Sequence, residues 1–463
     1  MLSDDQFLID FLAVVRLAYR KDPEKTFLMS TIARNVGLIK DPPLLASDVF
    51  GREHLSLFFL NQPIGYYRRF LSMSRELDTM SGLGRRKKGA LAKALSEGGE
   101  EWNAFQSVKS KKKMRDVLKL VHPPPPSEEL RGIWGWVVGR GTSSNPLIQS
   151  YESFMKWKDS SFERALEIAL ETPLPWSVVR SNISLEAILN RLSEKDLFKL
   201  FANTMSPFDV LAQLSTVVRT LGEDVAIDLL REKLKERVAA YSLARAVLGL
   251  SAQGYGKVSR WLFWNALLEK SERLYDILGF DEDEVVLLLD MSDQAFKRHK
   301  ILAEMGLFLR PKGTIYLFSK SEDSLMLDDE VLSSTEAGLE FWTALYSEEL
   351  LPLGEKPGTL DAMEEFSAKY ASKDKVLVVL TSEANEMNSI PALNYVNNLD
   401  KWKSVVVVGL GGDDPLPMSY GNLISVKGRS PDALIASLRM LKLMESEGSF
   451  DLKNFEKASE IGT

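Results

Sequence analysis

A carboxylate and a hydroxyl stand two residues apart at the end of an apolar run. Asp290 closes the stretch "EVVLLLD" (284–290), and Ser292 comes shortly after it. Because the run is continuously apolar, it predicts a buried parallel strand, and open α/β sheets bind ligands at the carboxyl ends of such strands. Two interpretations stay open here. Asp290 is half of a cation site, or it is a polar strand end that accepts hydrogen bonds from N–H groups of the following helix.

A second set of candidate residues is cationic. Residues 60–140 contain 16 Lys and Arg against 8 Asp and Glu, although the whole chain has a formal net charge of −7. The densest stretches are "GRRKKGALAK" (84–93) and "KSKKKMRDVLKL" (109–120), with Tyr67 and Trp102 nearby in the sequence. Clustered cations beside aromatic residues suit phosphate contacts and base stacking in a nucleic-acid site. The alternative is a charged helix face in water.

Helical periodicity indicates which of these cations share a face. At about 100° per residue, Lys112, Arg115 and Lys119 lie on one side of a helix, and Lys109 precedes Lys112 by three residues. The run of prolines at 123–126 should end this helix. Its buried side is expected to contain Val117, Leu118 and Val121. The predicted nucleic-acid contacts are Lys109, Lys112, Arg115 and Lys119, with a second, more mobile group of Arg85, Arg86, Lys87 and Lys88.

His122 follows these cations and is one of three histidines in the chain. The sequence offers it no metal partner or nucleophile, so taken alone it is typical of a surface or capping histidine. The chain contains no Cys, no G-x-x-x-x-G-K-[ST] phosphate loop and no paired carboxylates placed for acid–base work. We therefore predict that the protein is not an enzyme.

Composition also sets expectations about location. The absence of Cys excludes disulfides and thiolate zinc sites and suits a reducing cytoplasm. The first residues lack the basic segment of a signal peptide. No apolar run approaches the roughly 20 residues that a membrane helix needs. We expect a cytoplasmic protein without a membrane partner.

The elements that must position these residues are of two kinds. Residues up to 277 read as successive amphipathic helices, with predicted capping boxes at Ser160 with Glu163 and at Ser193 with Asp196. Another helix is predicted to start at Ser206 and Pro207, with Asp209 in its first turn, and to stop at Gly222. Its expected apolar face comprises Phe208, Val210, Leu211, Leu214, Val217, Val218 and Leu221.

From residue 281, short β-rich runs alternate with helical stretches, which predicts a doubly wound parallel sheet. The predicted strands are 285–290, 314–320, 375–381, 404–410 and 423–428. We thus expect a mainly α-helical solenoid domain over 1–277 and an α/β domain over 281–463.

Five stretches, in this order, resemble the Ro autoantigen family, in which a TROVE module of HEAT-like repeats precedes a von Willebrand factor A domain. They are "IARNVGLIKDPPLL" (32–45), "KMRDVLKLVHP" (113–123), "PLPWSVVRSN" (173–182), "MSPFDVLAQL" (205–214) and "EVVLLLDMSDQAF" (284–296). The resemblance implies a ring of helical repeats closed by the A domain. It also implies a basic hole that takes single-stranded ends of misfolded noncoding RNAs, and an outer surface that binds small structured RNAs.

The resemblance extends to single positions. The family's "SHKDLLRL-HP" segment matches this chain at Asp116, Lys119 and His122. The match makes His122 a further candidate for RNA binding. Upstream, the family's "K---R-GWSH" pattern meets Phe105 and Met114 here, and only Lys109 keeps its charge. RNA preference is therefore expected to differ from that of the family.

The A domains of this family resemble others that bind a cation at a metal-ion-dependent adhesion site, with a D-x-S-x-S motif, a Thr and a second Asp. Here Asp290 and Ser292 are present, Gln294 replaces the second Ser, Thr359 fits the Thr position, and Ser382 stands where the second Asp belongs. Mg²⁺ prefers hard oxygen ligands including carboxylates. The resemblance thus implies a degenerate Mg²⁺ site whose affinity is weakened by the lost carboxylate.

Taken together, the residues and the resemblance predict a monomeric RNA-binding protein. Its expected ligands are small or misfolded noncoding RNAs, in a ribonucleoprotein or in RNA quality control. The alternative is a protein–protein scaffold, in which the A domain holds a protein partner and RNA binding is weak or lost.

Overall fold

A computed structural model describes most of the chain between residues 84 and 427. The described ranges are 84–235, 240–278, 281–322, 324–382, 398–410 and 423–427, with parts of 56–71. The motif at 32–45 and the side chain of Arg86 lie outside the described residues. The described residues fall in two compact units: those up to Lys235 form the helical unit, and those from Ala240 form the sheet unit.

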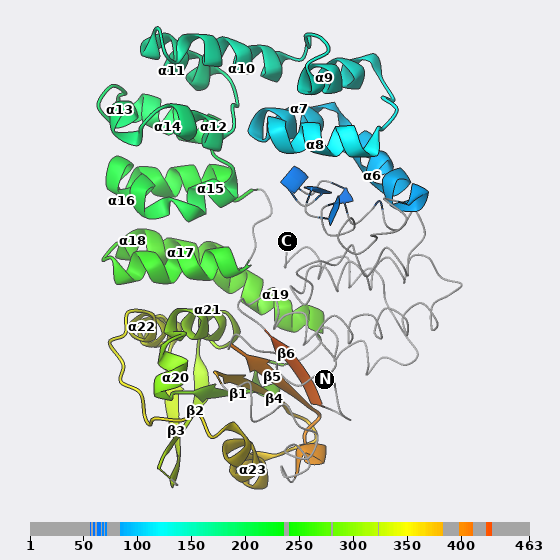
Figure 1. Cartoon of the computed structure of the whole chain (residues 1–463). Helices are drawn as coiled ribbons and strands as arrows, with labels where there is room; N and C mark the ends of the chain where they lie inside the picture. The colour runs from blue at the N-terminus through cyan, green and yellow to red at the C-terminus, as the bar shows by residue number, and fades with distance from the viewer. Residues whose placement is uncertain are drawn as a thin grey trace. The chain divides into compact units, whose positions relative to one another are not determined.

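The helical unit is built from short helices that pack on their neighbours in the sequence. In Figure 1 the α10–α11, α12–α14 and α15–α16 groups follow one another as layers, with α8 packed on α9 and α14 on α16. Contacts restricted to neighbouring repeats are the mark of a solenoid, as predicted. The helices are α6 (Arg85–Glu97), α7 (Gly99–Lys109), α8 (Lys111–Val121), α9 (Glu128–Val138), α10 (Pro146–Trp157), α11 (Phe162–Glu171), α12 (Trp176–Asn182), α13 (Leu185–Leu189), α14 (Glu194–Thr204), α15 (Pro207–Ala212) and α16 (Leu214–Lys233).

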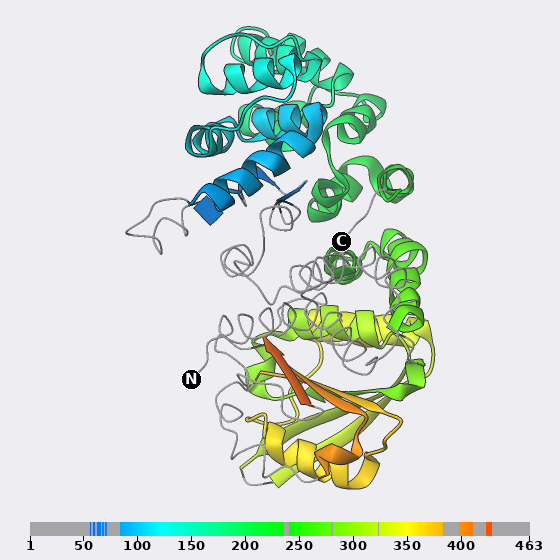
Figure 2. The ribbon, with the colours of Figure 1, turned by 90° about the vertical axis from the view of Figure 1, so that its right-hand side faces the viewer.

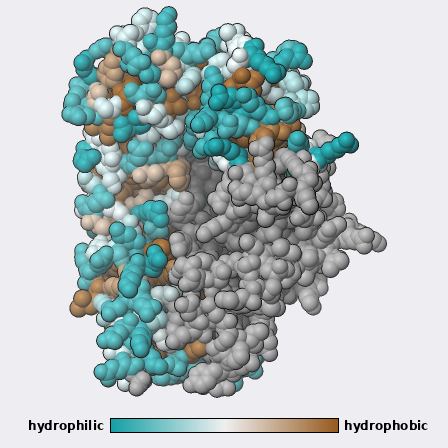
Figure 3. Space-filling model, viewed as in Figure 1, coloured by the Kyte–Doolittle hydropathy of each residue, from teal (hydrophilic) through white to brown (hydrophobic). Residues whose placement is uncertain are grey.

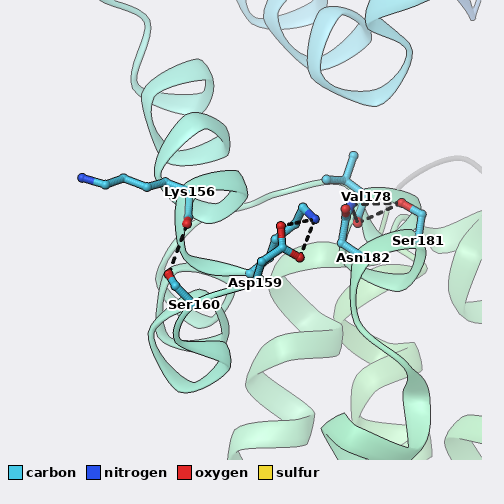
Figure 4. Close-up of polar contacts among 7 residues, drawn as sticks. Lys156, Asp159, Ser160, Val178, Ser181 and Asn182 are labelled. Atoms are coloured by element: carbon cyan, nitrogen blue, oxygen red, sulfur yellow. Dashed lines mark hydrogen bonds and ion pairs between the residues drawn. The ribbon is translucent and has the colours of Figure 1, made fainter.

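One of the predicted helix caps is wrong. Helix α11 is capped by Ser161 rather than Ser160, and no side chain makes the capping hydrogen bond. Figure 4 shows the reason: the Ser160 hydroxyl donates to the Lys156 carbonyl, 3.4 Å away, and so belongs to the turn after α10. The N-cap at Ser193 is confirmed, because its hydroxyl accepts from the Asp196 N–H at 3.2 Å, but the predicted capping box is not formed, since the Asp196 carboxylate accepts from the Ser193 hydroxyl, 2.6 Å away, and not from the Ser193 N–H.

The predicted helix start at Ser206 is confirmed, and it has a capping box that the sequence analysis did not predict: the Ser206 hydroxyl accepts from the Asp209 N–H, and the Asp209 carboxylate accepts from the Ser206 N–H. The helix that follows is shorter than predicted. It breaks at Gln213, but the stop predicted at Gly222 is confirmed: its backbone is not helical, with φ 75° and ψ 166°, and two helical segments of α16 meet there at a kink. Only glycine adopts this backbone conformation without strain. Phe208 leaves the predicted apolar face and is 57% exposed, whereas the other six residues are buried.

The sheet unit begins with helices α17 (Ala240–Ala252), α18 (Gly256–Leu262) and α19 (Leu268–Leu278), with a π-helical turn at Phe263–Leu267 between the last two. Helix α17 packs on α21 (His299–Leu309) and α22 (Thr335–Tyr346). The exposed Arg245 guanidinium lies 2.9 Å from the buried Glu304 carboxylate, which ties α17 to α21. Burial raises the pKa of Glu304, and Arg245 opposes that rise.

The sheet has six described strands in the order β3-β2-β1-β4-β5-β6. Helices α21 and α22 cover one face and α23 (Thr359–Tyr370) the other, so the sheet is doubly wound (Figures 1 and 2). On the α23 face, Phe366 stacks on Trp402 with 6.1 Å between ring centroids. The strands are β1 (Val285–Asp290), β2 (Gly313–Ser321), β3 (Ser324–Leu332), β4 (Val376–Thr381), β5 (Ser404–Gly409) and β6 (Leu423–Lys427).

All five predicted strands are confirmed, and they run parallel. The sequence missed β3, which pairs antiparallel with β2 at the edge of the sheet. Most of its side chains are exposed, so it lacks the apolar run that identified the others. The domain division at 277 and 281, and the closure of the helical repeats into a ring, stay predictions.

Candidate functional site

The residues of the predicted strand-end site lie together at the middle of the sheet. After β1, the chain adds β2 and β3 on one side of β1 and then crosses to its other side, where it adds β4, β5 and β6. The direction in which strands are added therefore reverses between β1 and β4. Such a reversal opens a crevice at the carboxyl ends of the strands. Asp290 ends β1 and Thr381 ends β4, while Thr359 is the first residue of α23.

A closed hydrogen-bond network joins these residues, which we call the strand-end cluster: Asp290, Ser292, Thr359, Thr381 and Ser382. Asp290 Oδ1 accepts from the Ser292 N–H at 2.9 Å. Asp290 Oδ2 accepts from the Ser382 N–H at 2.8 Å, the Ser382 hydroxyl at 2.6 Å and the Thr381 hydroxyl at 3.3 Å. Because Thr381 donates to Asp290, it accepts from Thr359, 2.7 Å away. The buried carboxylate is thereby satisfied on both oxygens.

The structure also decides which residue caps the helix after β1. The Ser292 hydroxyl accepts from the Ala295 N–H at 3.3 Å and caps the short helix α20 (Asp293–Phe296). The interpretation that Asp290 caps this helix is therefore wrong. Gln294, in the place of the family's second Ser, is exposed on α20. Thr381 was missed, although its position at the end of the strand beside β1 was a usable signal.

The oxygen atoms of the strand-end cluster make a poor set of ligands for Mg²⁺. They offer one carboxylate, and Asp290 Oδ2 already accepts three hydrogen bonds. The affinity of a hard-cation site depends on its number of charged ligands, which is one here. Across the described ranges, no group of three or more His, Asp and Glu is placed to hold a metal ion.

Only part of the predicted cationic face is present, because the helix that was expected to carry it is divided into two helices, α7 and α8. Helix α7 ends at Lys109, and Ser110, with φ −148°, separates it from α8. Lys109 therefore does not continue the face of Lys112. Its ammonium group lies 5.6 Å from the centre of the Phe105 ring on its own helix. Grouping Lys109 with Lys112 on one helix was wrong.

Helix α8 carries the rest of the face as predicted. Met114, Val117, Leu118 and Val121 are buried. Lys112, Arg115 and Lys119 are exposed, and we call them the α8 surface. In the described part of the chain none of the three forms an ion pair. Figure 3 shows a largely hydrophilic surface over α7 and α8.

Neighbouring charges are arranged so that the α8 surface stays cationic. Asp116, the carboxylate of this helix, lies 3.3 Å from the Arg68 guanidinium. Lys111 points away and places its ammonium group 3.4 Å from the centre of the Trp136 ring. Partial burial lowers the pKa of Lys111, opposed by the nearby Glu152. The other cations of α8, Lys112, Lys113, Arg115 and Lys119, are exposed to solvent.

The second predicted group begins helix α6, which packs against α8. Arg85, Lys87 and Lys88 lie in its first turn, where no acidic residue balances the positive end of the helix dipole. This group therefore starts a helix, and its mobility stays a prediction. His122 is exposed and ends α8 with a left-handed backbone, φ 51° and ψ 54°. This is the capping position expected from the sequence, and the prolines after it are not helical.

Comparison with known proteins adds one finding. No protein-family model matches the sequence, and no curated protein sequence does so either. Among solved structures, the crystal structure of the Deinococcus radiodurans Ro (RSR) protein is similar, with a TM-score of 0.52 and 16% identity, over 93% of this chain and 90% of that one. The chain has a Ro-like fold.

The Ro-like fold confirms the resemblance found in the sequence, a helical part followed by a von Willebrand factor A-like part. At this level of identity the likeness concerns the fold and carries no assignment of ligand. Within the residues that the structure describes, no helix is both long enough and apolar enough to cross a membrane.

Proposed function

We propose that this Ro-like protein binds RNA through the α8 surface and is not an enzyme. The observation that carries the proposal is the exposed row of Lys112, Arg115 and Lys119 over a fully apolar buried side. A cationic row held on a packed helix suits phosphate contacts along a nucleic-acid backbone. The family resemblance points to small or misfolded noncoding RNAs as the ligands, and the Ro family is generally non-catalytic.

The neighbouring helix supports the same assignment. The first turn of α6 brings further cations beside α8, and the positive end of its helix dipole favours an anion such as phosphate. RNA contacts from Arg85, Lys87, Lys88, Lys109 and His122 are part of the proposal.

We also propose that the strand-end cluster keeps its shape by hydrogen bonds and not by Mg²⁺. The Ser382 hydroxyl, 2.6 Å from Asp290, donates to the carboxylate that a cation would otherwise neutralise. A protein partner held through a shared Mg²⁺ ion is therefore not expected at this end of the sheet.

Binding of labelled RNA to the full chain across a salt series tests the main proposal. Contacts with single-stranded RNA phosphates make log K fall with log salt by about 0.7 per contact. Six contacts would give a slope of roughly −4. If neither single-stranded nor hairpin RNA binds above non-specific levels at low salt, the proposal fails and the scaffold alternative is preferred.

A further inference from the structure

Strand β3 forms an open edge of the sheet. It pairs with β2 over nine residues, Ser324–Leu332, and with no other strand in the described ranges (Figure 1). Every second residue of an edge strand directs its N–H and C=O groups away from the sheet, where a further strand can bond to them. Across the described residues, the β3 backbone makes one hydrogen bond besides those to β2: the Asp329 N–H donates to Asp328 Oδ1, 2.9 Å away. The rest of this edge is available to an added strand.

Strand β3 lacks the features that usually prevent an edge strand from pairing. Such strands are short, are interrupted by a bulge or a proline, or carry lysine. The register of β3 with β2 runs over nine residues without a skipped position, and its sequence, SLMLDDEVL, contains no Pro, Lys or Arg. Two of its apolar side chains are in contact with water, since Met326 is 40% exposed and Val331 is 61% exposed. A long, regular edge with exposed apolar side chains favours pairing with a further strand.

The charges on β3 decide which strand can pair with it. Asp328, Asp329 and Glu330 are all exposed, and the strand carries no cation. Asp329 has Lys369 of α23 close enough for electrostatic attraction, whereas Asp328 and Glu330 form no ion pair within the described residues. Pairing with β3 of a second copy would bring together three carboxylates from each chain, and like charges on neighbouring strands are destabilising. A basic strand is therefore the complementary partner.

The two faces of β3 specify the partner further. Because side chains alternate between the faces of a strand, Leu325 and Leu327 lie on one face, and Asp328 and Glu330 lie on the other. Leu325 and Leu327 are half-buried and pack against the core that α23 covers. An added strand places its own side chains on the same two faces. A strand with apolar residues on the α23 face and Lys or Arg on the opposite face would complement β3.

We propose that β3 binds an extended basic segment of another protein, which joins the sheet as a further strand beside β3. Hydrogen bonds along the backbone edge supply affinity, and the carboxylates of Asp328 and Glu330 select Lys or Arg over acidic residues. This contact lies at the edge of the sheet and not at the strand-end cluster, and it needs no metal ion. It does not depend on RNA binding.

Synthetic peptides test the proposal with the full chain. The probe is a fluorescein-labelled peptide, as long as β3, in which Lys and Val alternate, and its acidic counterpart alternates Glu and Val. Fluorescence anisotropy should show saturable binding of the basic peptide. The acidic peptide should bind at least about 10-fold more weakly, because two attractive charge pairs become repulsive.

Peptides with methylated backbone nitrogens separate strand addition from simple charge attraction. In an added strand, alternate residues direct their N–H groups towards β3 and away from it. Methylation of all Lys nitrogens and methylation of all Val nitrogens therefore block opposite edges of the peptide. One of these two peptides should bind at least about 10-fold more weakly than the parent, because several backbone hydrogen bonds are lost together. The other should bind as the parent does.

A double variant of the protein tests the two selecting carboxylates. Asp328→Asn with Glu330→Gln should weaken binding of the basic peptide about 2- to 30-fold, which is the effect of two lost exposed charge pairs. The Asn side chain keeps an oxygen that can accept from the Asp329 N–H. The matched control is Glu171→Gln with Glu232→Gln, which makes the same change in net charge at exposed positions of α11 and α16. The control should bind the peptide as the wild type does.

Four results would overturn the proposal. The first is that the basic peptide does not bind, or binds no better than the acidic one. The second is that the two methylated peptides bind equally, and the third is that the β3 variant and the control lose the same affinity. The fourth is a wild-type dimer in sedimentation velocity that becomes tighter in the β3 variant, because a second copy would then occupy the edge. No RNA enters these measurements, so their outcome is separate from that of the proposed function.

Discussion

Replacing Lys112, Arg115 and Lys119 together by glutamine removes the cations of the α8 surface and leaves its buried side intact. Lys112 lies in the first turn of α8 and Lys119 in the last. Loss of the Lys112 charge removes an unfavourable interaction with the positive end of the helix dipole, and loss of the Lys119 charge removes a favourable one with the negative end. Each changes the free energy of unfolding by about 0.3–1 kcal/mol. These effects oppose one another, so we expect little change in the free energy of unfolding.

The expected effect on RNA binding follows from the number of phosphate contacts. Three lost contacts flatten the single-strand salt slope by about 2 units. If wild type and variant converge near 1 M salt, this slope difference predicts roughly 50-fold weaker binding at 0.15 M. The loss should be similar for RNAs of different sequence, because phosphate contacts carry no sequence information.

Fluorescence anisotropy with labelled RNA over a salt series measures both quantities. The matched control is R131Q/R164Q/R231Q, which makes the same change in net charge at three exposed arginines that pair with acidic residues three positions away. The control should lose far less affinity than the α8 variant. Equal losses would mean that net charge alone drives binding, and wild-type binding by a folded α8 variant would show that this helix is only a solvated face.

Three further outcomes follow from the same structure. Ser382→Asp adds a carboxylate facing Asp290, so Mg²⁺ at 100 times its Kd should stabilise this variant by about 2.7 kcal/mol and leave the wild type unchanged in thermal unfolding; a Mg²⁺ response of the wild type would contradict the hydrogen-bonded cluster. Gly306→Ala would place a Cβ 2.1 Å from the Trp342 ring, and chemical denaturation should show a loss of about 1–3 kcal/mol or more; wild-type stability would be the contrary result. His122→Gly relieves a left-handed backbone and should raise stability by about 1 kcal/mol, while a simultaneous loss of RNA affinity would assign the imidazole to RNA binding.

Much of the fold was predictable because its signals are local. Strands β1, β4 and β5 are buried along their whole length, and each carries a continuous apolar run that is visible in the sequence. The caps at Ser193 and Ser206 depend on residues three positions apart. Strand β3 has no such signal, because it is held by pairing with β2 while its own side chains face solvent.

The break between α7 and α8 shows a limit of helical periodicity. In one continuous helix Val108 and Val117 would point to opposite sides, since nine residues at about 100° each amount to two and a half turns. Both residues are buried and both helices pack on α9, so the chain must turn at Ser110. The sequence has no Gly or Pro there to announce the turn, and packing on a third helix decides it.

The sequence by itself determined the types of residue available to this protein: the cations of α8, a single carboxylate at the end of β1, and a Ser where a second carboxylate would be needed. Only the tertiary structure decided what they do together. Asp290 and Ser382 are 92 positions apart, and they meet because β1 and β4 are adjacent in the sheet. Adjacency of strands depends on the free energy of packing the whole sheet between its two helical layers, which no local pattern of residues records.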